Sequence, residues 1–175
     1  WGLTMYSEDG GLHWTHVGIP EDLVMSPLAQ DIGLQPDDVI LYALSFPDRS
    51  RGWTVGEFGT IMATTDGGRT WRQQRSPVDT TLFGTHFEDS KRGWAVGIDA
   101  VILRTTDGGA TWRQIRAPLR QRSFYDIAIS GRGGWIAGDA GTLLKTLDRG
   151  ETWVLEPLPI ELAANWFRSV HLLPN

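Results

Sequence analysis

TTDGGATW, at residues 105–112, is one of four similar stretches that recur along the sequence. The others read SEDGGLHW at 7–14, TTDGGRTW at 64–71 and TLDRGETW at 146–153. The last three copies are spaced by 41 residues, and so is a Gly-Trp pair that begins at Gly52, Gly93 and Gly134. Seven of the nine Trp residues occupy these repeated positions. The chain is therefore built from repeated units.

Each unit predicts four short strands. In the unit that begins near residue 80, strands are expected at Thr81–Phe87, Trp94–Val96, Val101–Thr105 and Trp112–Ile115. The glycines of the stretch at 105–112 supply the positive φ that a tight turn requires. Four strands in about 40 residues, repeated, are typical of propeller blades. We therefore predict an all-β fold, a β-propeller of four-stranded antiparallel blades.

The register of the repeat makes the whole chain, 1–175, a single propeller arc of about 3.75 blades. The expected parts are a partial blade at 1–17, an inserted loop at 18–38, full blades at 39–75, 80–116 and 123–156, and a final strand at 166–173. Because a propeller usually closes with four to eight blades, we expect the arc to be part of a larger ring. Further chain or a second copy would complete that ring.

An irregular spacing indicates the inserted loop, because Trp14 and Trp71 are 57 residues apart rather than 41. Two interpretations of the loop stay open at this point. Long connections between blades often carry binding function, which favours a binding loop. The alternative is a solvated decoration with no function of its own.

The Asp of each repeated stretch is expected to serve structure rather than catalysis. Its carboxylate can accept backbone N–H groups of the turn that follows, and the hydroxyl two residues earlier can hold that turn. Each Asp belongs to a separate blade, so these carboxylates do not form an acid–base pair. The residues given this structural role are Asp9, Asp66, Asp107 and Asp148, with the interblade residues Trp14, Trp71, Trp112 and Trp153.

The composition excludes several function classes. The net charge of −5 and the lack of a long basic run argue against a nucleic-acid partner. Without cysteine there is no disulfide, thiolate metal site or cysteine nucleophile. The four His residues form no convincing metal site, so neither a metal nor a cofactor is expected. No apolar run reaches the length of about 18 residues that a membrane span needs.

The sequence offers little support for catalysis. Glycoside hydrolysis requires two carboxylates that face one sugar bond. Asp126, Asp37 and Asp38 are candidates near a central channel, but the repeat places no partner beside them. Tyr42 and Tyr125 likewise have no clear companions. We therefore predict a protein that is not an enzyme and has no catalytic residues, with a carbohydrate-binding or glycoside-hydrolysing propeller as the alternative.

An arginine-rich rim is the candidate partner-binding surface. Of the 16 basic residues, 14 are Arg, whose forked guanidinium suits carboxylates and phosphates. The alternative is that the Arg stems merely cover exposed strand edges. The candidate residues are Arg72, Arg75, Arg113 and Arg116 along the outermost strands, with Arg51 and Arg92 on the face of the repeated turns.

The stretch S/T-x-D-x-G-x-T-W resembles the Asp box, or BNR repeat, of sialidase-like propellers. The resemblance implies that the box joins the third and fourth strands at the edge of each blade. GWAVG at 93–97 followed by ILRTTDGGATW at 102–112 is more specific, and resembles the photosystem II stability/assembly factor family. The similarity covers nearly the whole chain outside the insertion. The chain departs from the family in its incomplete ring, its insertion and its first, looser Asp box.

The resemblance implies a seven-bladed propeller on the periplasmic or thylakoid-lumenal side, peripheral to the membrane. Its members associate with reaction-centre membrane proteins during assembly, and an arginine-rich surface takes part in that contact. The leading hypothesis is therefore a non-enzymatic propeller that docks on a membrane-embedded protein complex, as a photosynthetic assembly factor or accessory subunit. A self-assembling scaffold that closes a ring from two copies is a third hypothesis.

Overall fold

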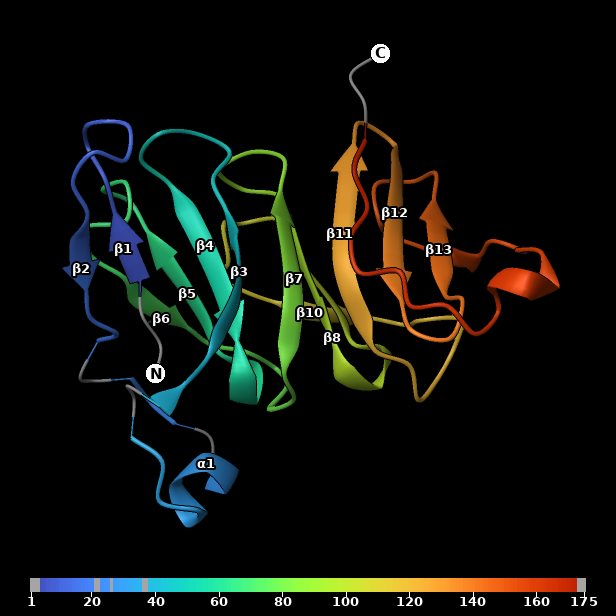
Figure 1. The fold of residues 1–175 in the computed structure, drawn as a ribbon, viewed down its shortest axis with the longest axis horizontal. Helices are drawn as coiled ribbons and strands as arrows, with labels where there is room; N and C mark the ends of the chain where they lie inside the picture. The colour runs from blue at the N-terminus through green and yellow to red at the C-terminus, as the bar shows by residue number, and fades with distance from the viewer. Residues whose placement is uncertain (1–3, 21–22, 26, 36–37, 173–175) are drawn as a thin grey trace.

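The structure, a computed structural model, describes residues 4–20, 23–25, 27–35 and 38–172. These residues form three four-stranded antiparallel sheets and one two-stranded sheet (Figure 1). Within each large sheet the strand order follows the order of the chain. The predicted all-β fold of four-stranded blades is confirmed.

The strands repeat with the period seen in the sequence. The two-stranded sheet comprises β1 (Thr4–Tyr6) and β2 (Thr15–Val17). The first blade comprises β3 (Leu41–Ser45), β4 (Gly52–Gly56), β5 (Ile61–Thr64) and β6 (Arg72–Gln74). The second comprises β7 (Leu82–Phe87), β8 (Gly93–Gly97), β9 (Ile102–Thr105) and β10 (Arg113–Ile115). The third comprises β11 (Phe124–Ser130), β12 (Gly133–Gly138), β13 (Leu143–Thr146) and β14 (Val154–Leu155).

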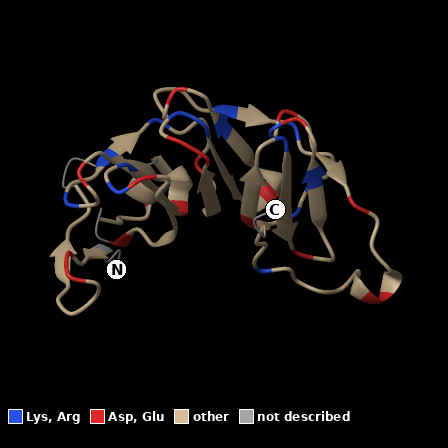
Figure 2. Cartoon of the chain, turned by 90° about the horizontal axis from the view of Figure 1, so that it is seen from above, with Lys and Arg blue, Asp and Glu red and all other residues tan. Residues whose placement is uncertain are grey.

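The blades stand side by side in an open arc (Figure 2). The first strand of each blade lies on the concave side, where β7 contacts both β3 and β11. The last strands, β6, β10 and β14, lie at the other edge of each sheet, on the convex side. The arc therefore has a concave inner surface, a convex rim and two faces made of loops.

Aromatic rings fill the junctions between blades. At the first junction, Trp53 of β4 stacks on Phe87 of β7 with ring centroids 3.6 Å apart, and Trp112 is buried in the same cluster. At the second junction, Trp94 of β8 is completely buried among residues of β11 to β13. Gly93 makes room for the ring of Phe87 at the first junction, because a Cβ at this position would lie 2.3 Å from that ring.

The inserted loop is anchored on the first blade by four buried side chains. Its side chains Ile19, Leu23, Met25 and Ala29 are buried in one cluster with Met62 and Trp71 of the first blade. The loop contains one short helix, α1 (Pro27–Asp31), which the sequence pattern did not predict. The buried cluster argues against the interpretation of the loop as a solvated decoration.

The C-terminal segment differs from the expected final strand. Residues 166–172 belong to no sheet, and position 173 lies outside the described residues. The segment instead runs beside β11, where Asp126 Oδ2 accepts hydrogen bonds from Ser169 Oγ at 2.8 Å and Val170 N at 2.9 Å. Asp126 thus engages a backbone N–H that a strand would use for pairing. A short 3-10 turn, η4 (Ile160–Leu162), lies just before the segment.

The remaining helical turns are equally short. Two 3-10 turns, η2 (Glu57–Gly59) and η3 (Ile98–Ala100), connect the second and third strands of the first two blades. None of the helices within the described ranges is long and apolar enough to cross a bilayer.

Candidate functional site

The Asp-box turns share one hydrogen-bond arrangement. In the second blade, Thr105 Oγ1 donates to Asp107 Oδ1 at 2.8 Å and accepts from Gly109 N at 2.8 Å. Thr111 donates to Asp107 from its backbone N at 2.9 Å and from its hydroxyl at 2.6 Å. The same bonds recur around Asp66 and Asp148. At Asp9 the partners are Ser7 and His13.

These hydrogen bonds keep the Asp-box carboxylates ionised. The bonds from Thr111 and Thr105 lower the pKa of Asp107 to about 2, and those from His13 and Ser7 lower the pKa of Asp9 to about 2. Burial acts to raise the pKa of Asp148, but the bonds from Thr152 and Thr146 outweigh it and bring the value to about 2. Thr70 lowers the pKa of Asp66 further still. Carboxylates so committed to turns are poorly suited to proton transfer near neutral pH.

The six arginines proposed for partner binding differ in their pairing. Arg92 is paired with Asp89 at 2.7 Å and lies 3.7 Å from Glu88. Arg113 is paired with Glu151, which also binds the buried Arg104 at 2.8 Å. The other four are exposed and form no ion pair within the described ranges; they are Arg51, Arg72, Arg75 and Arg116.

Arg72 and Arg113 lie on the convex side of the arc, in β6 and β10, and Arg75 and Arg116 directly follow these two strands. Figure 2 shows basic residues spread along this side, interspersed with acidic ones. Among the candidate arginines of the convex rim, Arg72, Arg75 and Arg116 therefore have no acidic partner in the part of the chain that the structure describes. This arrangement can bind carboxylates of another molecule.

The carboxylates considered for sugar chemistry are engaged in local structure. Asp126 holds the C-terminal segment through Ser169 and Val170. Asp38 accepts a hydrogen bond from Gln35 N at 2.9 Å, which closes a turn of the inserted loop. Asp37 lies outside the described residues. No group of three or more His, Asp or Glu side chains within the described ranges could hold a metal ion.

A row of aromatic rings lies along the concave side, which the sequence reasoning missed. Tyr42 contacts Phe83 with ring centroids 5.0 Å apart, Phe83 contacts Tyr125 at 5.5 Å, and Tyr125 contacts Trp166 at 6.1 Å. Arg168 covers the last two rings. A signal was present in the sequence, since residues 42 and 83 are 41 positions apart, as are 125 and 166.

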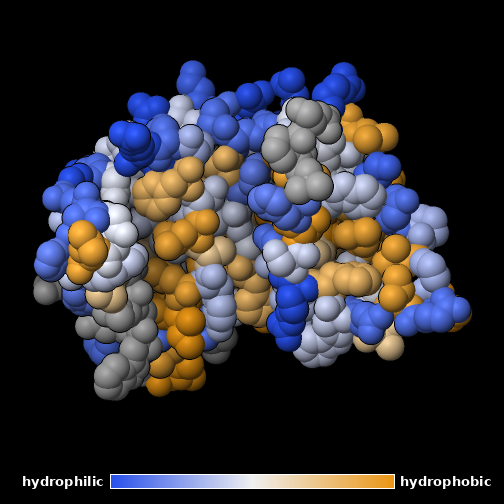
Figure 3. Space-filling model, turned by 45° about the horizontal axis from the view of Figure 1, so that its top comes forward, coloured by the Kyte–Doolittle hydropathy of each residue, from blue (hydrophilic) through white to orange (hydrophobic). Residues whose placement is uncertain are grey.

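Apolar surface surrounds this row of rings. Tyr42, Leu44 and Phe46 of the β3 edge are 45%, 57% and 43% exposed. The space-filling view shows hydrophobic side chains gathered on this side below a hydrophilic upper edge (Figure 3). Phe46 is the repeat equivalent of the buried Phe87, and it is exposed because no complete blade covers it in the described arc.

Comparison with known proteins identifies the family. The family model described as "Photosynthesis system II assembly factor YCF48" matches residues 69–165, which is more than half of the chain. The chain belongs to this family. A search among curated proteins gave no match.

Solved YCF48 structures resemble the arc. "YCF48 bound to D1 peptide" is 33% identical over 66% of this chain and 38% of that one, with a TM-score of 0.59. YCF48 from Cyanidioschyzon merolae is 25% identical over 67% of this chain and 40% of that one, with a TM-score of 0.57. The chain thus spans about two fifths of the length of these YCF48 proteins.

A glycoside hydrolase shares the fold alone. The GH74 enzyme of Niastella koreensis is 16% identical over 66% of this chain and 22% of that one, with a TM-score of 0.53. The YCF48 family was the resemblance expected from the GWAVG and Asp-box combination, and it is confirmed. The roles of individual rim arginines remain predictions.

Proposed function

We propose that this chain is part of a non-enzymatic, protein-binding propeller that docks on a membrane-embedded complex, as an assembly factor or accessory subunit of a photosynthetic reaction centre. The observation that carries the proposal is membership of the YCF48 family, together with 33% identity to a YCF48 solved with a D1 peptide. Because the chain spans 38% of that protein, the docking surface is argued from its own residues.

The convex rim is the proposed docking surface. Arg72 and Arg75 of the first blade and Arg116 of the second are exposed and have no acidic partner within the described part of the chain. A guanidinium presents a rigid fork of donors that matches a carboxylate, so this surface favours acidic segments of a protein partner. We place the protein on the periplasmic or lumenal side of the membrane, peripheral to it.

The absence of catalysis is part of the proposal. The four Asp-box carboxylates are engaged by the turns that follow them, and each belongs to a different sheet. Asp126 in turn binds the C-terminal segment. These engagements favour a binding role over the alternative of a sugar-hydrolysing propeller, which needs two carboxylates that face one bond.

Native purification with mass spectrometry of the attached proteins tests the proposal. We expect membrane proteins of a photosynthetic complex to copurify in fixed stoichiometry, and the double variant Arg72→Glu/Arg116→Glu to lose them. Arg132→Glu, an exposed charge reversal in the β11–β12 turn, is the matched control and should retain them. If the double variant retains the partner, the convex rim is not the docking surface. If the protein purifies without a partner yet binds polysaccharides, the alternative of a carbohydrate-active propeller is favoured.

A further inference from the structure

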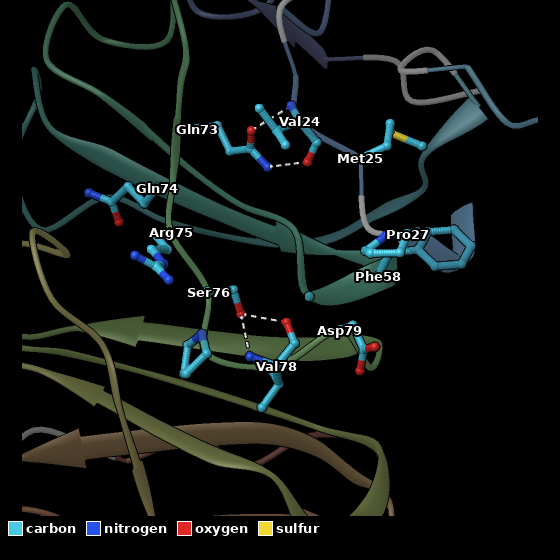
Figure 4. A pocket seen from close by; sticks show the side chains of 12 residues that line it. Val24, Met25, Pro27, Phe58, Gln73, Gln74, Arg75, Ser76, Val78 and Asp79 are labelled. Carbon is cyan, nitrogen blue, oxygen red and sulfur yellow. Dashed lines mark hydrogen bonds between the residues drawn. The ribbon is translucent and has the colours of Figure 1, made fainter. Parts of the chain in front are cut away.

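Two grooves occupy equivalent places in the first and second blades. The β6 groove, of about 680 Å³, is lined by residues that include Phe58, Gln73, Arg75 and Val78 (Figure 4). The β10 groove, of about 530 Å³, is lined by the residues 41 positions later, Asp99, Gln114, Arg116 and Leu119. The two grooves are therefore products of the same repeat, which makes their differences informative.

One wall of the β6 groove is formed by a segment of the inserted loop, which includes Val24 and Met25. The Gln73 side chain accepts a hydrogen bond from Val24 N at 2.7 Å and donates one to Val24 O at 2.9 Å, as the dashed lines in Figure 4 show. Leu23 and Met25 are buried, whereas Val24 between them is 73% exposed. This alternation is that of an extended segment. One glutamine amide thus holds both backbone groups of one residue in an extended segment.

The β10 groove has the same glutamine without the segment. Gln114 is exposed, and its amide forms no hydrogen bond within the described part of the chain. Ile115, Ala117 and Leu119 supply an apolar lining. Arg116 and Arg120 are exposed there, with Asp99 as the acidic lining residue. The groove therefore offers a donor–acceptor amide, an apolar lining and an excess of positive charge.

We propose that the β10 groove binds an extended acidic peptide segment of a partner protein. Gln114 holds the backbone N–H and C=O of one residue, as Gln73 does for Val24, while Arg116 and Arg120 face flanking carboxylates. A peptide fits better than a phosphate group, because a phosphate supplies acceptors only and leaves the Gln114 oxygen without a donor. The inference rests on the proposed function in that the natural ligand is a protein.

Titration with a peptide that contains Val24, the residue bound by Gln73, tests the proposal. The probe is a fluorescein-labelled peptide with the sequence of residues 20–28, PEDLVMSPL, and the readout is fluorescence anisotropy with the intact chain. We expect saturable binding that Gln114→Ala weakens about tenfold, because two hydrogen bonds are lost. Gln73→Ala is the matched control, with the same change at the equivalent position, and should leave the affinity within about twofold.

Four results would overturn the proposal. One is no saturable binding up to the millimolar range. Another is equal binding by wild type and Gln114→Ala. The third is weakening by Gln73→Ala alone, which would show that the peptide displaces the internal segment instead. A peptide with Glu21→Gln and Asp22→Asn should bind more weakly, and equal binding would refute the acidic preference. Because the titration uses no native partner, its failure is distinguishable from failure of the proposed function.

Discussion

Trp53 Nε1 donates a hydrogen bond to the backbone oxygen of Gly108 at 3.2 Å, across the junction between the first and second blades. Gln74 Nε2 donates to the same oxygen at 2.8 Å, and its Oε1 accepts from Trp112 Nε1 at 3.1 Å. Two residues of the first blade therefore hold the Asp-box turn of the second. The junction thus combines stacked rings with these three hydrogen bonds between blades.

Replacing Gln74 should weaken this junction. In Gln74→Leu, the Trp112 N–H loses its acceptor in a part-buried environment, and we expect the free energy of unfolding to fall by about 1–3 kcal/mol. Gln114→Leu is the control for the same chemical change, since Gln114 is exposed and its side chain forms no hydrogen bond within the described residues, and it should change stability by less than about 0.5 kcal/mol. Urea unfolding measures both, and equal effects would contradict the role assigned to Gln74.

Replacement of Gly109 by alanine should destabilise the protein more than the same replacement of Gly131, a glycine that also has a positive φ. Gly109 has φ +85° and a Cβ there would lie 1.9 Å from Gln74 Oε1, whereas Gly131 has φ +58° and open space around it. Both Ala variants bear about 1–2 kcal/mol of backbone strain. Gly109→Ala should lose about 1–3 kcal/mol more through overpacking. Thermal unfolding of the two variants compares them directly, and indistinguishable midpoints would show that Gln74 moves aside at little cost.

The Asp boxes predict a loss of stability in acid. The folded-state pKa values of Asp9, Asp107 and Asp148 are about 2, below the ordinary value of 3.8. Each group thus contributes stability that is present above pH 3.8 and is lost as pH falls toward 2. We expect the urea midpoint to vary little with these groups between pH 7 and about 5 and to drop steeply below about 4. Asp107→Asn should be less stable at pH 7 and show a shallower drop, and an unchanged slope would contradict this.

Loss of the Glu151 charge is expected to lower the stability of the fold and to strengthen partner binding. Burial lowers the pKa of Arg104 while Glu151 acts to raise it, and Glu151 also pairs with Arg113 on the rim. Glu151→Gln should lower the free energy of unfolding by about 1 kcal/mol, since Glu151 is half exposed. It should also release Arg113, so the native partner should be retained at higher salt. Glu161→Gln, an exposed change of the same charge, should alter neither quantity.

The fold was predictable because repetition made each local signal visible several times. Predicted strands such as Val101–Thr105 differ from the observed β9, Ile102–Thr105, by one residue. The final strand was wrongly extended from the same register. In the structure, Val170 N donates a hydrogen bond to Asp126 instead of pairing with a strand. A contact between residues 44 positions apart cannot be predicted from the alternation of residues along a strand.

The candidate site was less predictable than the fold. Sequence position could place Arg113 on an outer strand, but only the structure shows its pairing with Glu151, 38 residues away. The inserted loop had no repeat to guide interpretation, so its buried residues and helix α1 were missed. The two glutamines did carry a signal, because the pair Arg72-Gln73 recurs 41 residues later as Arg113-Gln114. The sequence analysis did not select them, because glutamine has neither a charge nor metal-binding chemistry.

The second junction lacks the Gln74 and Gly108 hydrogen bonds of the first, and its polar contacts are instead the ion pairs of Glu151 in the third blade with Arg104 and Arg113 in the second. One repeat after Gln74 stands the apolar Ile115, and one repeat after Gly108 stands Arg149. The Nε1 group of the buried Trp94, the counterpart of Trp53, has no acceptor within the described part of the chain. In a linear array each unit is stabilised by its neighbours alone, so an unequal pair of junctions divides the array into unequal cooperative units. The third blade should therefore open as a separate foldon, with amide hydrogens that exchange before those of the first two.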